Sequence, residues 1–385
     1  MRLEEMTRAF EQYKELVKKT FLDDRVGRDP WAKKPEEAKI NGVHGVGEEK
    51  DPEWEMDYYF GSYAETEIHE SMLKDAVRTE SYRDFIYNNK SYFKGKVVLD
   101  VGCGTGILSM FAARAGAAKV YAVDNSTIIN KARKIVAENG FENVITFVQG
   151  KVEEISLPVD TVDIIISEWM GYFLLYEGML DSVLHARDRW LAPDGIMAPS
   201  RTDILIAAMD DEEWVNDKYH FWNDVYGFKM QTMKKGFLTD GQVDFADPKC
   251  IISDYATVKR IDIDATTTAQ LDFDSPFRLT INREGRINAL CGWFDTFFDG
   301  EDEDGNGLEK VFFSTGPAVK GTHWKQTMFA FEPAVDVVVG STVEGTFKCT
   351  KSQENHRELV ILADFVIKAP GGGEGVRVTR SFQVR

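Results

Sequence analysis

The sequence of 385 residues predicts a parallel α/β domain followed by a mainly antiparallel β domain. Between residues 96 and 191, short apolar runs alternate with helical patterns, which is typical of a doubly wound parallel sheet. Beyond residues 197–199, which read Met-Ala-Pro, helical patterns become rare and short β-like runs follow one another. We therefore divide the chain into residues 54–198 and 199–385, with residues 1–53 in front of them.

The elements of the α/β domain follow from apolar spacing. Apolar residues three and four apart predict a helix over residues 1–22, and the Gly- and Pro-containing residues 23–53 predict a linker. Two further helices are expected within residues 65–93. The strands expected next are 96–101, 119–124, 143–150 and 162–167, and the helices that alternate with them are 107–116, 128–139 and 178–191.

The β domain shows several strand patterns and one helical interruption. The strands expected are 203–209, 277–282, 289–298, 346–350 and 359–368. Residues 214–228 interrupt this series with an aromatic-rich helical pattern. The acidic run 299–304 is expected to be a solvated turn.

Bulk composition narrows the class of protein. Hydrophobic residues at 43% and charged residues at 29% are ordinary for a soluble globular protein. No stretch approaches the roughly 18 apolar residues of a membrane helix, and the N-terminus lacks the apolar core of a secretion signal. Cys103, Cys250, Cys291 and Cys349 lie far apart and form no CxxC pair, so free thiols are expected rather than a disulfide framework or a metal site. We expect a cytoplasmic protein that also enters the nucleus.

The net charge of −18 bears on the partners of the protein. Nucleic-acid binding is disfavoured, because it needs a basic surface. An acidic field instead steers basic partners toward the surface. A charge that only keeps the protein soluble explains the same number equally well.

The run VVLDVGCGTG carries the first chemical signal. A strand ends at Asp100, and Gly102, Gly104 and Gly106 then turn the chain into a helix so that a ligand can approach the backbone. A nicotinamide-binding domain is the rival interpretation. The GxGxG spacing and the preceding carboxylate favour S-adenosyl-L-methionine, because a carboxylate repels a pyrophosphate but suits an ammonium group. Asp124 ends the next strand, where it can accept hydrogen bonds from ribose hydroxyls. Cys103 is interpreted as a small filler.

The run IIISEWMGYFLLYEGML carries the second signal. It holds Glu168 and Glu177, separated by eight largely apolar residues, after the fourth predicted strand. Acids between apolar walls suit a cation inside a cleft. The planar guanidinium of arginine matches two carboxylates, which would localise charge on one terminal nitrogen and leave the other freer to attack a methyl group. The alternative is that Glu177 lies in a first helical turn and that Glu168 is at the surface.

From about Tyr58 to the C-terminus, the sequence resembles the type I protein arginine N-methyltransferases. The motifs that carry this resemblance are YFGSYAETEIHESMLKDAVR, VLDVGCGTG, KVEE, SEWMGYFLLYE and THWKQT. RTESYRDFIY, VGCGTGILSMFAA, AVDNS and FFSTGP carry a closer likeness to the zinc-finger-bearing branch, which methylates a small-subunit ribosomal protein. The zinc-finger cysteines of that branch are absent from this sequence. The resemblance implies a Rossmann-like class I methyltransferase domain followed by a β-barrel domain with a helical dimerisation arm.

The resemblance also implies a set of cofactor contacts. Arg78 would pair with the cofactor carboxylate, and His69 would lie against the cofactor. Tyr59, Phe60 and Tyr63 would belong to a helix that closes over it. The remaining cofactor residues implied are Met72, Asp100, Gly102, Gly104, Asp124, Val152, Glu153 and Met179. The alternatives are that His69 only caps or solvates its helix and that the tyrosines are simple core residues. Without the resemblance, Met72 at helical spacing from Ile68 is more often a core residue.

The catalytic residues implied are Glu168, Glu177, and His323 paired with Asp75, which would help to remove the proton. The substrate residues implied are Tyr59, Met72, Glu168, Tyr172, Glu177 and Trp324. Met72 and Met179 correspond to two methionines at the reacting centre, and the first favours asymmetric dimethylation because relatives with the symmetric product carry a bulkier aromatic there. Gly178 stands where serine is usual, which is expected to loosen the segment. The alternative for Asp75 is that it only caps or solvates its helix.

The resemblance implies a homodimer formed through an arm at about residues 210–232. Exposed aromatic side chains there favour a partner surface. The residues concerned are Trp214, Phe221, Trp222, Tyr226 and Phe228, together with Val225. Expected substrates are basic Arg/Gly-rich proteins, among them a small-subunit ribosomal protein or histones, with no direct nucleic-acid or membrane contact. Two rivals remain: a methyltransferase for a small molecule or another residue, and a non-catalytic cofactor-binding scaffold.

Overall fold

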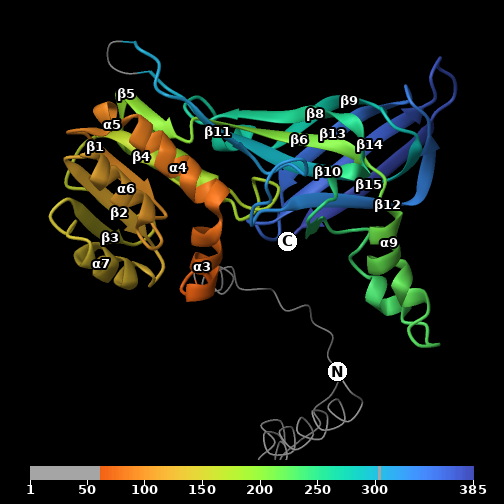
Figure 1. Cartoon of the computed structure of the whole chain (residues 1–385), viewed down its shortest axis with the longest axis horizontal. Helices are drawn as coiled ribbons and strands as arrows, with labels where there is room; N and C mark the ends of the chain where they lie inside the picture. Colours follow the sequence, from red (N-terminus) through yellow and green to blue (C-terminus); the bar gives the residue numbers. More distant parts are fainter. Residues whose placement is uncertain (1–60, 302–304) are drawn as a thin grey trace, which may run out of the picture. The chain divides into compact units, whose positions relative to one another are not determined.

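The computed structural model describes residues 61–301 and 305–385, which belong to one compact unit spanning Asp51–Arg385 (Figure 1). The helix expected over residues 1–22, the linker expected over 23–53, and Tyr59 and Phe60 lie outside the described residues.

The first part of the described chain is a parallel α/β sheet, as predicted. Its five strands lie in the order β3-β2-β1-β4-β5, and every neighbouring pair is parallel. The strands are β1 (Val97–Val101), β2 (Lys119–Asp124), β3 (Ile145–Gln149), β4 (Val162–Ile166) and β5 (Leu191–Ala198). The helices are α3 (Thr66–Lys74), α4 (Ala76–Asn88), α5 (Lys90–Phe93), α6 (Ile107–Ala115), α7 (Ile129–Glu138) and α8 (Met179–Trp190).

The strand order places the ligand-binding edge of this sheet. The chain runs from β1 outward to β3 and then returns to the other side of β1 with β4. Open α/β sheets bind ligands outside the carboxyl ends of their strands at such a reversal. Because the glycine-rich turn follows β1 and Glu168 follows β4, the fold itself brings the two predicted signals together.

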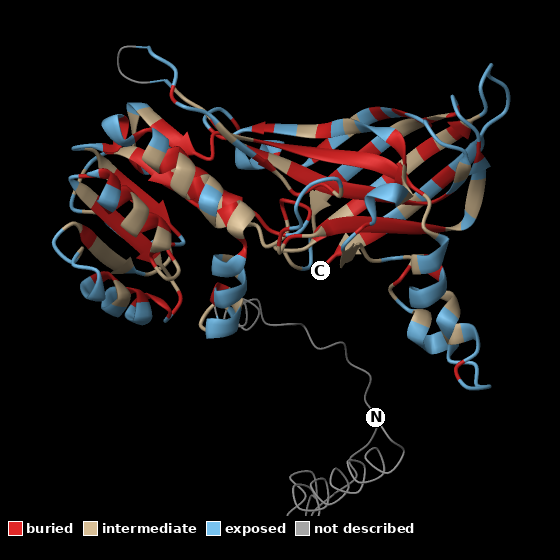
Figure 2. Ribbon diagram, viewed as in Figure 1, coloured by how far each residue is buried: buried red, intermediate tan, exposed pale blue. Residues whose placement is uncertain are grey.

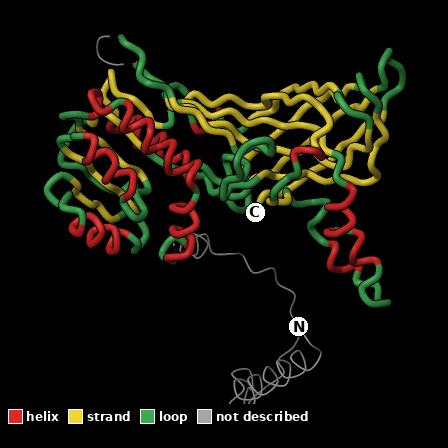
Figure 3. Tube along the Cα trace, in the orientation of Figure 1, coloured by secondary structure: helices red, strands yellow, loops and turns green. Residues whose placement is uncertain are grey.

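The second part consists of two antiparallel sheets, which Figure 3 shows as the strand-rich half. One sheet has the order β7-β12-β10-β6-β8, with β11 beside β10, and the other has the order β15-β14-β13-β9. The strands are β6 (Arg201–Met209), β7 (Gln242–Asp244), β8 (Ile251–Asp262), β9 (Phe273–Thr280), β10 (Gly285–Phe298), β11 (Val311–Ser314), β12 (Gln326–Val337), β13 (Thr342–Lys351), β14 (Leu359–Lys368) and β15 (Val376–Val384). A bridge between Ser253 and Ile281 joins the sheets on one side, which gives the predicted barrel-like form.

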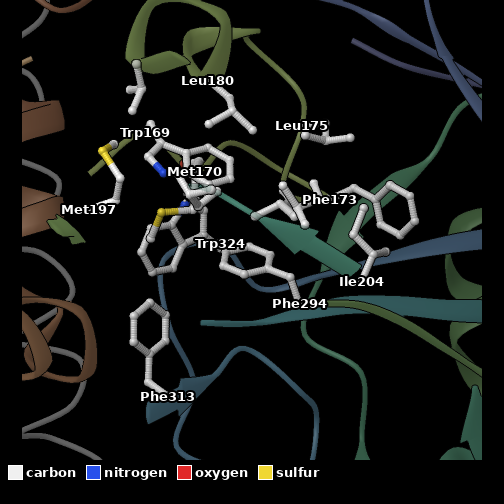
Figure 4. Close-up of a cluster of buried hydrophobic side chains, with 14 of the residues drawn as sticks. Trp169, Met170, Phe173, Leu175, Leu180, Met197, Ile204, Phe294, Phe313 and Trp324 are labelled. Atoms are coloured by element: carbon white, nitrogen blue, oxygen red, sulfur yellow. Dashed lines mark hydrogen bonds between the residues drawn. The ribbon is translucent and has the colours of Figure 1, made fainter. Parts of the chain in front are cut away.

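One hydrophobic core runs through both parts. Many strand segments are buried in Figure 2, and buried apolar side chains from all three sheets belong to one cluster, beside a smaller cluster that holds Leu205, Trp293 and Met328. Figure 4 shows the part of that cluster in which Trp169, Met170 and Phe173 from the segment after β4 meet Phe294 and Trp324 of the second part. The segment that carries the paired glutamates therefore rests directly on the barrel.

The helical interruption is shorter than predicted. Helix α9 spans Glu212–Lys218, and its N-cap Asp211 accepts a hydrogen bond from the N–H of Trp214. Two short 3-10 helices follow, η2 (His220–Asn223) and η3 (Gln231–Lys234), with a tight turn between them where Tyr226 has φ +52°. The aromatic spacing predicted one helix over residues 214–228, but this turn ends the helical path (Figure 1).

Part of the predicted partner surface is not exposed. Trp214 packs against Phe237, with ring centroids 4.9 Å apart, and Val225 is buried. Tyr226 and Phe228 are instead 97% and 69% exposed, and Phe221 is half exposed. Trp222 is half-buried. Of the predicted residues, Phe221, Tyr226 and Phe228 therefore remain exposed, and we call this set the arm.

Candidate active site

A cavity of about 500 Å³ opens at the carboxyl ends of β1 and β4, where the α/β part meets the barrel. Its lining comes from α3, the glycine-rich turn, the segment 168–179, and two barrel turns at 323–324 and 356–357. Among the described residues, all predicted site residues except Asp100 and Asp75 line this cavity. Asp75 lies just behind the lining, bonded to His323.

The glycine-rich turn needs its glycines. Gly102, Gly104 and Gly106 have φ of +73°, +52° and +83°, a region that side chains rarely adopt. A Cβ on Gly102 would lie 2.2 Å from Cε of Met179, and a Cβ on Gly104 would lie 3.2 Å from the ring of His69. The turn therefore presents bare backbone to the cavity, as a bound nucleoside requires.

Asp124 holds this turn in place. One of its carboxylate oxygens accepts from the N–H of Gly104 at 2.8 Å, and the other accepts from the N–H of Ser126 at 2.7 Å. Burial raises the pKa of this carboxyl despite those two hydrogen bonds. Asp124 lines the cavity at the end of β2, where the sequence predicted a ribose contact.

The structure corrects the prediction that Asp100 lines the cofactor site. Its side chain is fully buried beneath the turn and accepts a hydrogen bond from Oγ of Ser109 at 2.6 Å, so it does not line the cavity. Burial raises its pKa to about 7. The sequence pattern placed it correctly at the end of β1, but the alternation of side chains along a strand directs this one under the turn.

Val152 and Glu153, the pair implied to border the adenine, also line the cavity. Val152 is buried, and the carboxylate of Glu153 accepts a hydrogen bond from Oγ of Ser182 at 2.5 Å. His69 lies near the glycine-rich turn, with Nε2 2.8 Å from the carbonyl oxygen of Tyr63. Burial lowers the pKa of His69, so its imidazole is neutral at neutral pH.

Glu168 forms a buried ion pair with Arg78. The guanidinium nitrogens Nη2 and Nε lie 2.7 and 2.8 Å from the same oxygen, Oε2, and both side chains are less than 10% exposed. The other oxygen of Glu168, Oε1, is buried and has no hydrogen-bond partner among the described residues. Glu168 thus already binds one guanidinium and keeps a second acceptor, which excludes the alternative that it is a surface residue.

Glu177 also faces the cavity. Oη of Tyr63 donates to its Oε2 at 2.6 Å, and the residue precedes Gly178, the N-cap of α8. The alternative of a purely helix-capping Glu177 does not fit, since its carboxylate is bound by Tyr63. Gly178 has φ +68°, which explains why glycine is suited to this position.

Two hydrogen bonds from outside hold the backbone of the segment that carries the glutamates. Phe173 and Leu174 have φ of +48° and +69°, so the backbone is strained. Oη of Tyr82 donates to the carbonyl of Ser167 at 2.8 Å, and Nε1 of Trp324 donates to the carbonyl of Met170 at 2.7 Å. Trp324 therefore borders the cavity and also holds the segment that carries the glutamates.

His323 and Asp75 meet as the resemblance implied. Oδ2 of Asp75 lies 2.7 Å from Nδ1 of His323 and accepts from its backbone N–H at 2.8 Å. Burial alone would raise the pKa of Asp75, but hydrogen bonds from His323 and from the N–H of Arg78 outweigh it, so the pKa is lowered. Asp75 is also the N-cap of α4, so the capping and pairing interpretations are both correct.

The remaining predicted residues also line the cavity. Met72 from α3 and Met179 from α8 both lie there, and the carbonyl of Met72 accepts from Nη1 of Arg78 at 3.3 Å. Tyr172 is at the mouth, with 37% of its surface exposed, and its ring stacks on that of Tyr176 at 6.0 Å.

Sequence reasoning missed Tyr82, Ser182 and Arg357. Tyr82 and Ser182 lie within predicted helices, where no sequence pattern distinguishes them from their neighbours. Arg357 lies in a turn 180 residues from Glu177, so no local pattern could have connected the two.

Within residues 61–301 and 305–385, no group of three or more His, Cys, Asp or Glu side chains is arranged to hold a metal ion. Within the same residues, no helix combines the length and apolarity needed to cross a membrane.

The two parts of the chain match two family models. Residues 98–195 match the model described as a methyltransferase domain, and residues 200–370 match the model of the arginine methyltransferase oligomerization subdomain. The boundary between these matches agrees with the change of architecture between β5 and β6.

Individual relatives cover most of the chain. Protein arginine N-methyltransferase 1 of Dictyostelium discoideum is 47% identical over 80% of this chain and 89% of its own length. Ribosomal protein arginine N-methyltransferase rmt3 of Schizosaccharomyces pombe is 48% identical over 79% of this chain, but over only 56% of its own length. Among solved structures, PRMT1 of Trypanosoma brucei, in an enzyme–prozyme heterotetrameric complex with AdoHcy, is 41% identical, with a TM-score of 0.77 over 84% of this chain and 100% of that one.

Proposed function

This chain belongs to the protein arginine N-methyltransferase family, and from that premise we propose that it forms asymmetric dimethylarginine in Arg/Gly-rich proteins. Its activity is the transfer of methyl groups to arginine side chains of proteins, and its cofactor is S-adenosyl-L-methionine, with S-adenosyl-L-homocysteine as the product. The observation that carries the proposal is the buried, unpartnered Oε1 of Glu168 in the same cavity as the carboxylate of Glu177.

The residues that line the cavity fit two adjacent parts of the cofactor. The bare backbone of Gly102 and Gly104 and the carboxylate of Asp124 suit the ribose, and Val152 and Glu153 suit the adenine. When bound, this cofactor supplies a methyl group on a positively charged sulfur. Arg78 is placed to attract the cofactor carboxylate, since its guanidinium reaches the cavity while it stays paired with Glu168.

The glutamates would hold the substrate. Glu168 binds the guanidinium of Arg78 through Oε2, which leaves Oε1 for a second guanidinium. Glu177 would bind the other edge of that group, because a planar guanidinium can donate to carboxylates on two sides. The burial of Glu168 and the partial burial of Glu177 strengthen the attraction, and the fixed orientation favours attack by one terminal nitrogen.

His323 is suited to receive the proton that the substrate nitrogen releases. Because Asp75 is ionised and accepts from Nδ1 of His323, the proton of the neutral imidazole resides on Nδ1. Nε2 is then left as the proton acceptor. Asp75 thus fixes the tautomer in which His323 can act as a base.

The product type follows from the width of the pocket. Met72 and Met179 line it together, and an unbranched, flexible thioether leaves room for a nitrogen that already carries one methyl group. We infer that the same nitrogen can therefore be methylated twice.

Charge, sequence kinship, the arm and the cysteines support the proposed substrates, assembly and location. The net charge of −18 favours basic proteins, and the name of the fission yeast relative refers to a ribosomal protein; histones are a second basic class. The motifs RTESYRDFIY and FFSTGP support kinship with the zinc-finger-bearing branch, although the identities of 47% and 48% to the two relatives are equally high. The exposed arm supports a homodimer, and four free cysteines support a cytosolic location.

The test is methyl transfer to a defined peptide. The full chain is incubated with S-adenosyl-L-methionine and a peptide of Gly-Arg repeats, beside a matched peptide in which lysine replaces each arginine. We expect dimethylation of the arginine peptide alone, with neutral loss of dimethylamine in mass spectrometry. Loss of monomethylamine would overturn the asymmetric product, and methylation of neither peptide would favour a small-molecule substrate or a non-catalytic scaffold.

A further inference from the structure

Glu177 has a backbone conformation that residues with side chains rarely adopt. Its φ is +77°, and Gly178 beside it has φ +68°. A residue other than glycine keeps such a conformation only where its surroundings impose it. Because the direction of a side chain follows from its backbone, the contacts that fix this backbone also aim the carboxylate of Glu177.

Both backbone polar groups of Glu177 bind one residue of the barrel, Arg357. The N–H of Glu177 donates to the carbonyl oxygen of Arg357 at 2.8 Å. In return, Nη1 of Arg357 donates to the carbonyl oxygen of Glu177 at 2.7 Å. The two residues are 180 positions apart in sequence, so this reciprocal contact connects the α/β part to the turn between β13 and β14.

The turn that carries Arg357 is itself fixed by hydrogen bonds. The N–H of Ser352 donates to the carbonyl of Glu358 at 2.8 Å, which closes the turn. Asn355 accepts inside it twice, through its carbonyl from the N–H of Glu358 and through Oδ1 from the N–H of Arg357 at 3.1 Å. Arg357 therefore starts from a defined backbone, and its guanidinium contact with Glu177 is built into the fold.

We propose that Arg357 is a positioning residue for methyl transfer, which holds the left-handed backbone of Glu177 so that its carboxylate meets the substrate guanidinium. This inference rests on the proposed function. Arg357 acts through Glu177: its guanidinium donates to the carbonyl oxygen of Glu177, and the carboxylate of Glu177 is the group that meets the substrate. The turn between β13 and β14 thereby becomes part of the substrate site, although its sequence has no catalytic pattern.

The test compares three substitutions in the full chain. Arg357→Ala removes the donor to the carbonyl of Glu177, and Arg357→Lys keeps one donor with a different shape. The matched control is Arg380→Ala on β15, because Arg380 is also half-buried and also donates to a backbone carbonyl, that of Glu332 at 2.7 Å, away from the cavity. Melting temperature and cofactor affinity are measured for each protein.

We expect Arg357→Ala to lower kcat/KM for the Gly-Arg peptide by about 100-fold, the size of effect that a small misplacement of a reacting group produces. The loss should fall on kcat as well as KM, while the affinity for S-adenosyl-L-methionine stays unchanged. Arg357→Lys should recover part of the loss, and Arg380→Ala should keep wild-type kinetics.

A double-mutant cycle separates this role from direct substrate binding. In a Glu177→Gln background, Arg357→Ala should add little further loss, because both changes remove the same function. Equal losses from Arg357→Ala in both backgrounds would overturn the proposal, and so would wild-type kcat in Arg357→Ala. If Arg357→Ala does not fold, the lysine variant is carried through the same cycle. Lack of peptide methylation by the wild-type chain would instead refute the proposed function.

Discussion

The buried pair of Glu168 and Arg78 makes a quantitative prediction about the two glutamates. Glu168→Gln and Glu177→Gln are the same chemical change, and both should suppress methyl transfer on the order of 10²–10³-fold by removing charge that stabilises the transition state. Their effects on stability should differ, because the partners of the two carboxylates differ. Glu168 neutralises a buried guanidinium, whereas Glu177 accepts a hydrogen bond from the neutral phenol of Tyr63.

The size of the difference follows from these contacts. Removing one member of a buried ion pair costs roughly 3–5 kcal/mol, and glutamine keeps one acceptor for Arg78, so we expect about 2–3 kcal/mol for Glu168→Gln. Glu177→Gln replaces a hydrogen bond to a charged acceptor by one to a neutral acceptor, which costs about 1 kcal/mol. At about 2 °C per kcal/mol for a large unit, the melting temperatures should fall by about 4–6 °C and about 2 °C.

The assay combines thermal unfolding with methyl transfer. Melting is followed by circular dichroism for wild type and both variants at pH 7, and transfer is followed with labelled cofactor and the Gly-Arg peptide. Cofactor binding, measured by calorimetry, should persist in both variants. If Glu168→Gln melted at or above Glu177→Gln, the ion pair would not contribute as the geometry indicates. Wild-type transfer by Glu168→Gln would remove its catalytic role altogether.

Two other predictions concern Asp100 and the arm. Because burial raises the pKa of Asp100 from 3.8 to about 7, its contribution to stability is complete below pH 3.8 and is lost as the pH rises toward 7. Asp100→Asn should therefore lose less melting temperature than wild type between pH 4.5 and 7.5 in differential scanning fluorimetry, and parallel curves would contradict the raised pKa. In the arm, Tyr226→Glu places a charge on a side chain that is 97% exposed, so it should leave folding intact but yield monomers in light scattering. A Tyr226→Glu protein that stays dimeric would show that the arm is not the interface.

The sequence predicted the parallel sheet well because its strands are apolar on both faces and its helices have regular spacing. It missed β5, whose sequence LAPDGIMA contains proline, aspartate and glycine, residues that disfavour strands. It also missed β8 and β15, since their polar faces dilute the apolar signal at the barrel surface. The missed strand β12 contains Glu332, Pro333 and Asp336, residue types that disfavour strands. Tertiary pairing, rather than local propensity, makes these segments strands.

The candidate site was predictable where motifs are local and hidden where contacts are long-range. Glycine spacing identified the turn after β1, and two acids in an apolar run identified the glutamate segment. The same reasoning placed Asp100 in the cavity, although the pleat of β1 turns it beneath the turn. It also treated Trp214 as a partner contact, because aromatic spacing does not reveal that Phe237 lies against that ring.

The shared core in Figure 4 limits how this protein can change in evolution or in engineering. Trp169 and Met170 of one part pack in the same cluster as Trp324 and Phe294 of the other, and Nε1 of Trp324 donates to the carbonyl of Met170 in the glutamate segment. A catalytic half expressed alone would expose this apolar surface to solvent, and its glutamate segment would lose its contacts with the barrel. New specificity is therefore more readily acquired by changing surface turns than by exchanging whole halves between enzymes.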